Sequence, residues 1–167
     1  VGSNGPMAMP AALPPTSGYT YAVELSADEA VAKVAGRDVV FSQPVPIYVE
    51  NFLAFPVGEL VPVGYYDRDA GTWVPSDNGR VIKITSISGG LATVDTVGTG
   101  SLPPIVLDTA ERQKLATLYS VGQELWRTPV SHFSTWDKNW GVSPPSLTYS
   151  TSTGVKPSPT VGCARKN

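Results

Sequence analysis

Residues 125–136 read Leu-Trp-Arg-Thr-Pro-Val-Ser-His-Phe-Ser-Thr-Trp, and this stretch indicates the fold class most clearly. Successive side chains of a β-strand point to opposite faces, so residues two apart share a face. Here one face would carry Trp126, Thr128, Val130, His132, Ser134 and Trp136. The period of two predicts a continuous strand through residue 136.

The same reasoning outward from this stretch predicts a mostly β chain. Further strands are predicted at 19–25, 38–41, 45–50, 60–66, 72–74, 80–87 and 91–94. A short helix is predicted over about 27–35, and a second helix begins after Asp108 and ends before Gly122. We therefore expect an antiparallel β-sandwich with one or two short helices.

Composition supports a single folded domain between two less regular ends. The chain has 167 residues, of which 41% are apolar and only 16% charged, with 16 glycines and 16 prolines favouring many turns. We expect an extended segment at 1–18, a β-sandwich domain at 19–141 and a Ser/Thr/Pro-rich linker or tail at 142–167.

Charge and residue counts argue against several classes of function. A formal charge of −2 argues against nucleic acid as a partner, and no apolar run is long enough to predict a membrane span. Cys163 and His132 are the only cysteine and histidine, too few for a zinc site or an internal disulfide. Walker A, dinucleotide-binding and lipase-type glycine patterns are absent. We expect neither a metal nor a cofactor.

The tripeptide His132-Phe133-Ser134 carries the strongest chemical signal. A serine hydroxyl can attack the carbonyl of the preceding residue and convert the peptide to an ester, which water then hydrolyses. An ordinary serine is a weak nucleophile, so the reaction needs a base and a distorted peptide. His132 would face the same side as Ser134 and has the right basicity, and Phe133 could anchor the peptide from the other face. Asp137 is the nearest acid in sequence that could orient the imidazole.

A purely structural interpretation of the same residues stays open. The histidine would then bond a backbone carbonyl, and the serine would be a satisfied hydroxyl. The domain would be a non-catalytic spacer or adhesion module.

Three other features have weaker functional interpretations. The loop 95–101 spaces oxygens like a calcium loop, but Asp95 is its only carboxylate, so a plain loop is favoured. Residues 67–69 form an acidic motif that is better explained as a hairpin turn. Exposed aromatic residues could bind carbohydrate, although Trp73, Trp126 and Trp136 are more simply explained as core residues.

Several segments resemble a known domain family. VFSQPV (40–45), GYYD (64–67) with Trp73-Val74, and VSHFS (130–134) resemble the ZU5 domain pattern. FLAFPVG (52–58), WVPSDNGR (73–80) and HFSTWD (132–137) look like a region of bacterial RHS/YD-repeat proteins, which are large, exported or cell-surface proteins often linked to toxins. The resemblance covers roughly residues 6–141.

The resemblance implies a ZU5-like sandwich and, in ZU5–UPA (FIIND) relatives, self-cleavage between Phe133 and Ser134 with the fragments remaining associated. It also implies a bacterial extracellular or cell-surface location and, as partners, neighbouring domains of a larger polypeptide. Two departures stand out. The bacterial family often has an acidic, calcium-like loop after the strand at 91–94, and here only Asp95 of those carboxylates remains. The self-cleaving relatives also often use a helper histidine upstream of the cut, and this chain has none. His132 would then depend on an acid, for which Glu111, Glu124 and Asp137 are candidates.

Overall fold

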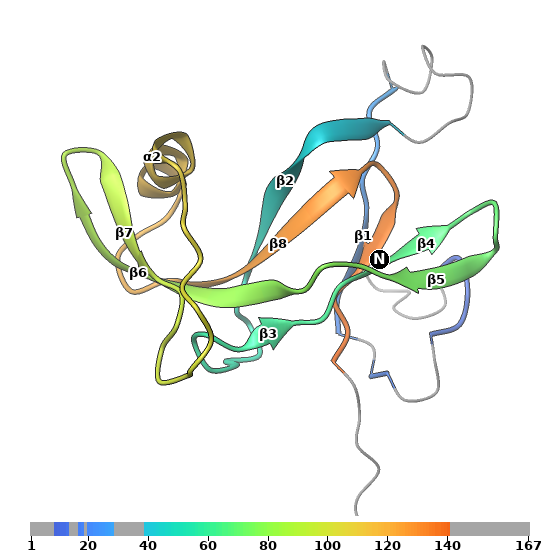
Figure 1. Ribbon diagram of the computed structural model, residues 1–167, viewed down its shortest axis with the longest axis horizontal. Helices are drawn as coiled ribbons and strands as arrows, with labels where there is room; N and C mark the ends of the chain where they lie inside the picture. The colour runs from blue at the N-terminus through green and yellow to red at the C-terminus, as the bar shows by residue number, and fades with distance from the viewer. Residues whose placement is uncertain (1–8, 14–16, 19, 29–38, 141–167) are drawn as a thin grey trace, which may run out of the picture.

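The computed structural model describes residues 9–13, 17–18, 20–28 and 39–140. The predicted helix over 27–35 and the predicted tail at 142–167 fall mainly or wholly outside these residues. The described part is mostly β, with antiparallel sheets and one described helix, so the expectation of a β-sandwich-like fold is confirmed (Figure 1).

Two antiparallel sheets make up the fold. The smaller sheet has the order β1 (Ala22–Glu24), β9 (Thr135–Asp137), β4 (Gly64–Asp67) and β5 (Thr72–Pro75). The larger sheet has the order β2 (Val40–Glu50), β8 (Glu124–His132), β6 (Gly79–Ser88) and β3 (Leu60–Val61), and β7 (Leu91–Asp95) pairs with the far half of β6. The hairpin turn predicted at residues 67–69 is confirmed as the connection between β4 and β5, and β6 and β7 form a second antiparallel hairpin.

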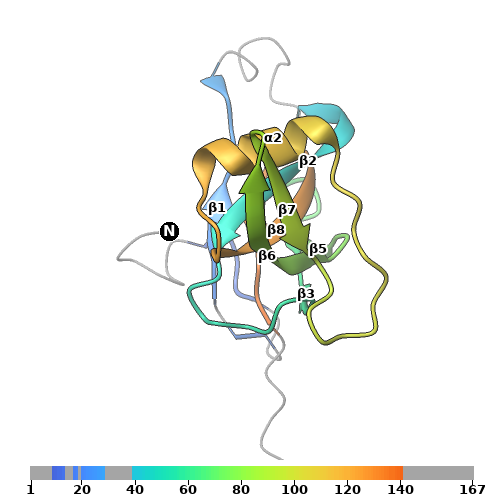
Figure 2. The same ribbon diagram turned by 90° about the vertical axis from the view of Figure 1, so that its left-hand side faces the viewer.

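Where β6 pairs with the start of β8, both faces of the sheet are buried. Val81 and Trp126 belong to one core cluster, whereas their neighbours Ile82 and Leu125 belong to another. The first cluster joins the two sheets through Val61, Val63, Val81, Trp126, Val130 and Trp136. The second lies under helix α2 (Thr109–Leu118), which contributes Leu115 and crosses β7 in Figure 2.

Helix α2 begins where the sequence predicts. The Asp108 carboxylate accepts a hydrogen bond of 2.7 Å from the Glu111 backbone amide, which satisfies one of the free amides of the first turn. The helix ends at Leu118, ahead of Gly122. The N-cap prediction is therefore confirmed.

Three predicted strand boundaries are wrong. The two strands predicted on either side of Pro44 are one strand, β2, with a register irregularity between Val40 and Val45 that accommodates the proline. The predicted strand 60–66 is divided between β3 and β4, which belong to different sheets. The predicted strand 125–136 is divided between β8 and β9 in the same way. In these two stretches the chain changes sheets within a single predicted strand, at Pro62–Val63 and at Phe133–Ser134.

Candidate functional site

The His-Phe-Ser tripeptide occupies the corner between the two sheets. His132 is the last residue of β8, and β9 begins at Thr135, so Phe133 and Ser134 form the bend (Figure 1). The Phe133 amide donates to the Val39 carbonyl at 2.9 Å, and the Ser134 carbonyl accepts from the Leu25 amide at 2.9 Å. Backbone hydrogen bonds therefore hold the chain on both sides of the Phe133–Ser134 peptide.

The imidazole of His132 is buried among aromatic rings. Its ring meets the edge of Tyr65 with centroids 4.6 Å apart and lies 5.0 Å from the ring of Trp136. Nδ1 lies 3.0 Å from the hydroxyl of Ser131, and Nε2 is buried with no hydrogen-bond partner among the described residues. One ring nitrogen is thus held by a neighbour and the other is free.

Ser134 and Phe133 are fixed by separate contacts. Ser134 is 1% exposed, and its hydroxyl donates a hydrogen bond of 2.9 Å to the backbone carbonyl of Tyr66. The half-buried ring of Phe133 packs edge-on against Phe41, with centroids 5.0 Å apart. No hydrogen bond joins the imidazole of His132 to the hydroxyl of Ser134 within the described part of the chain. The bend buries both groups at one corner, but their hydrogen bonds go to other atoms.

Asp137 does not contact His132. Its Oδ2 accepts a hydrogen bond of 2.6 Å from the Asn139 side chain. Trp136 is adjacent to Asp137 on β9 and packs against the imidazole, so strand alternation turns the Asp137 carboxylate to the opposite face. Burial raises the pKa of Asp137 above its usual value, and the Asn139 hydrogen bond opposes this in part. The acid nearest in sequence to the corner therefore faces elsewhere.

The other two candidate acids are also engaged away from the corner. Glu111 forms a two-point ion pair with Arg127, with N–O distances of 2.6 and 3.1 Å, and accepts a hydrogen bond from the hydroxyl of Tyr48. Glu124 pairs with Lys83 at 3.0 Å and accepts from the Asn51 side chain. Among the described residues, no carboxylate is hydrogen-bonded to His132.

The two acidic loops use their carboxylates to close turns. Asp95 Oδ1 accepts from the amides of Val97 and Gly98, both at 2.9 Å, and these bonds lower the pKa of Asp95. Asp67 Oδ1 likewise accepts from the amides of Asp69 and Ala70. Over the residues that the structure describes, no three His, Cys, Asp or Glu side chains gather as a metal site.

Two of the three tryptophans predicted in the core are fully buried. Trp126 and Trp136 have no exposed surface, whereas Trp73 is half-buried beside a cavity. The amino-acid sequence does not indicate Tyr65 and Tyr66 as neighbours of the tripeptide, because β4 meets β9 only through sheet pairing. Nor does it indicate that the side chain of Lys138 is fully buried, since a lysine in an irregular segment carries no signal of burial.

Comparison with known proteins adds no relative. No family model, curated protein or solved structure matches this chain. The likeness to ZU5 and RHS/YD-repeat proteins thus depends on the quoted sequence segments alone. In the described part of the chain, no helix combines the length and the apolar character needed to cross a bilayer.

Proposed function

We propose that the chain cleaves its own backbone between Phe133 and Ser134. The observation that carries this proposal is the position of the tripeptide. A buried imidazole with a free Nε2 and a buried serine hydroxyl lie at a sharp bend, where hydrogen bonds hold the chain on both sides of one peptide. A peptide bond can be kept distorted only if the chain is held in place on both sides of it.

The chemistry needs only these residues and water. Ser134 Oγ attacks the carbonyl carbon of Phe133 and forms a C–O bond, while its proton passes to Nε2 of His132. The five-membered intermediate breaks its C–N bond, and the Ser134 nitrogen takes the proton back from the imidazole. Water then hydrolyses the ester, which leaves a carboxylate on Phe133 and restores the Ser134 hydroxyl.

One rearrangement must precede attack. The Ser134 hydroxyl must leave the Tyr66 carbonyl and turn toward the imidazole, which requires at least a change of the Ser134 side-chain rotamer. The packing of Phe133 on Phe41 keeps the acyl side of the peptide in place during this rotation. Cleavage would therefore be slow to start in a chain that holds the serine in the Tyr66 hydrogen bond.

The fragments would remain associated after cleavage. Strand β9, which follows the cut, pairs with β1 on one side and β4 on the other, and it buries Trp136 completely. The described fold thus holds the downstream fragment by sheet hydrogen bonds and by apolar burial, both of which survive loss of one covalent bond.

A non-catalytic structural module is the second candidate. It is favoured by the hydrogen bond from Ser134 to Tyr66, which already satisfies the hydroxyl. It is also favoured because no carboxylate among the described residues is hydrogen-bonded to His132. On this alternative, the tripeptide serves only to turn the chain from one sheet to the other.

Intact mass and denaturing electrophoresis of the purified chain separate the two candidates. Self-cleavage gives fragments 1–133 and 134–167 that coelute under native conditions, and hydroxylamine speeds the cut by attacking the ester. Ser134→Ala and His132→Ala should abolish the fragments, and Ser88→Ala, on an exposed part of β6, should not. A single uncut species at every pH, with or without hydroxylamine, would leave only the structural module.

A further inference from the structure

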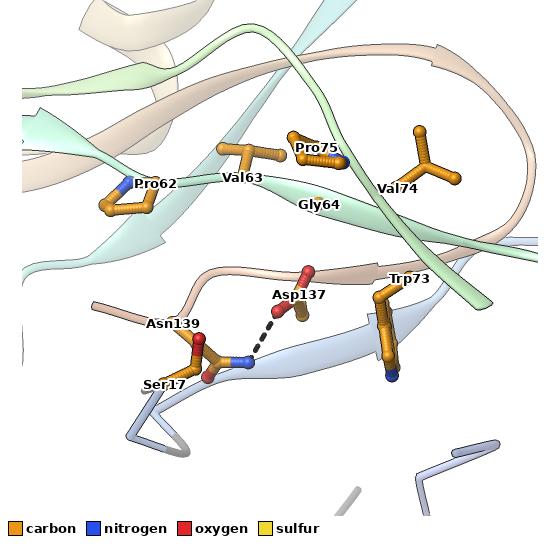
Figure 3. Close-up of a pocket in the computed structure, with 9 residues that line it drawn as sticks. All are labelled: Ser17, Pro62, Val63, Gly64, Trp73, Val74, Pro75, Asp137 and Asn139. Carbon is orange, nitrogen blue, oxygen red and sulfur yellow. Dashed lines mark hydrogen bonds between the residues drawn. The ribbon is translucent and has the colours of Figure 1, made fainter. Parts of the chain in front are cut away.

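A small cavity lies on the face of the smaller sheet that carries Asp137. Its volume is about 150 Å³, and its wall joins β9 to the β4–β5 hairpin and to Ser17. Figure 3 shows the Asp137 carboxylate between Asn139 on one side and Trp73 on the other, with Gly64 across from it. Trp73, Val74 and two prolines, Pro62 and Pro75, give most of the wall an apolar character.

One polar atom in this wall lacks a partner. Asp137 is only 9% exposed, and its Oδ1 has no hydrogen bond among the described residues. The backbone amides of Gly64 and of Asp137 itself lie near enough to the carboxylate to oppose the rise in its pKa, but neither meets the geometry of a hydrogen bond to Oδ1. A buried carboxylate oxygen without a donor is costly, so a donor supplied from outside would be stabilising.

Gly64 helps to keep this oxygen accessible. A Cβ atom at position 64 would lie 2.5 Å from Asp137 Oδ1, closer than the two atoms can approach. The residue that pairs with Asp137 in the sheet therefore carries no side chain that would displace the carboxylate.

The remaining polar groups narrow the class of ligand. Asn139 uses both ends of its amide, since Nδ2 donates to Asp137 and Oδ1 accepts from the backbone of Thr20. A sugar would need several free polar partners, and a guanidinium would need both carboxylate oxygens. Among the described side chains of the wall, Oδ1 of Asp137 is the one buried acceptor without a partner, and a single such acceptor matches a single ammonium group. A lysine side chain, with four methylenes and one ammonium, is also of a size that a cavity of about 150 Å³ admits.

We propose that this cavity binds the side chain of a lysine from another polypeptide. The ammonium donates to Oδ1 of Asp137, and the four methylenes lie against Trp73, Val74 and the two prolines. The proposal does not depend on cleavage at Phe133, because Asp137 faces away from His132.

Two matched probes test the charge requirement on the unmodified chain. The ¹⁵N-labelled protein is titrated with Nα-acetyl-lysine N-methylamide and, separately, with the norleucine analogue, which keeps the methylenes and lacks the ammonium. The lysine probe should shift the Gly64 and Val74 amides and the Trp73 indole, and it should bind about tenfold or more tightly than the norleucine probe. Equal binding of both probes, or no saturation with the lysine probe up to roughly 50 mM, would overturn the proposal.

Substitutions then test whether the Asp137 carboxylate accepts the hydrogen bond from the lysine ammonium. Asp137→Asn should weaken lysine binding about tenfold or more and leave norleucine binding unchanged. Asp69→Asn removes the same charge from an exposed turn and should bind like the parent chain. Should Asp137→Asn fail to fold, the probe comparison on the parent chain still decides the matter. Equal lysine affinity in a folded Asp137→Asn chain would count against this site.

Discussion

The indole nitrogen of Trp136 donates a hydrogen bond of 3.1 Å to the backbone carbonyl of His132. The two residues belong to different sheets, so this bond closes the corner at which the chain passes from one sheet to the other. Both partners are buried, and water cannot replace the donor if it is lost.

Trp136→Phe should therefore cost more than a change of ring size alone. It leaves the His132 carbonyl without a donor and leaves a small void, for a loss of about 2–4 kcal/mol in the free energy of unfolding. The matched control is Trp73→Phe, since Trp73 is half-buried and its indole donates to Ala11 over a longer 3.3 Å. Urea unfolding of both variants makes the comparison, and equal losses would show that the corner bond contributes little.

Lys138→Met should stabilise the chain at neutral pH. The Lys138 ammonium is fully buried, has no hydrogen-bond partner in the described structure and lies 5.1 Å from the centre of the Tyr21 ring. Burial lowers the pKa of Lys138 from 10.5 to about 8. Below pH 8, Lys138 is protonated in both the folded and the unfolded chain. In that range, lowering its pKa by this amount on folding reduces the free energy of unfolding by about 3 kcal/mol.

Because the folded and unfolded chains lose the Lys138 proton at different pH, the free energy of unfolding should depend on pH. From about pH 8 to 10.5 the unfolded chain keeps a proton on Lys138 that the folded chain has released. The free energy of unfolding therefore rises with pH across this window in the parent chain. The rise should be missing from Lys138→Met and present in Lys114→Met, whose lysine is exposed. Urea unfolding at pH 7, 8, 9 and 10 measures it, and parallel curves for all three chains would contradict the prediction.

Glu111→Gln should destabilise the contact between α2 and the larger sheet. The Glu111 and Arg127 side chains are only 11% and 16% exposed, so removing one charge leaves the other buried and unpaired. The expected loss is about 3–5 kcal/mol in the free energy of unfolding. Glu24→Gln breaks the exposed pair of Glu24 with Arg68 and should cost less than about 1 kcal/mol. Thermal and urea unfolding compare the two, and similar costs would be the contrary result.

Gly58→Ala should be among the most damaging single-methyl additions. Gly58 has a φ of 89°, and a Cβ there would lie 1.9 Å from the Val97 carbonyl oxygen, which is backbone and cannot turn away. We expect a loss of about 3 kcal/mol or more. Gly90→Ala has a similar positive φ but nothing within 4 Å, so it isolates the backbone strain of about 1–2 kcal/mol. Equal unfolding free energies for the two variants would mean that the loops containing Gly58 and Val97 move apart at little cost.

Local patterns in the sequence predicted the elements that depend on neighbouring residues. The alternation from Trp126 to His132 correctly indicated a strand with one buried face, and Asp108 correctly marked the start of a helix. Both depend on hydrogen bonds or side-chain directions within a few residues, so they can be inferred without knowledge of the rest of the fold.

The sheet changes could not be predicted in this way. Alternation continues through Phe133 and Ser134, so the pattern predicts one strand where the structure has a corner, and the same holds at Pro62–Val63. Which sheet a strand joins depends on partners distant in sequence, such as β1 and β4 for β9. The resulting environments, including the aromatic contacts of His132 and the buried ammonium of Lys138, follow from those pairings.

The amino-acid sequence by itself determined a β-rich chain, the helix cap at Asp108 and the presence of one imidazole two residues before one serine. Only the tertiary structure decided that Asp137 faces a cavity and not that imidazole. The physical reason is that neighbouring side chains on a strand point to opposite faces, and the partners on each face are set by sheet pairing over long separations.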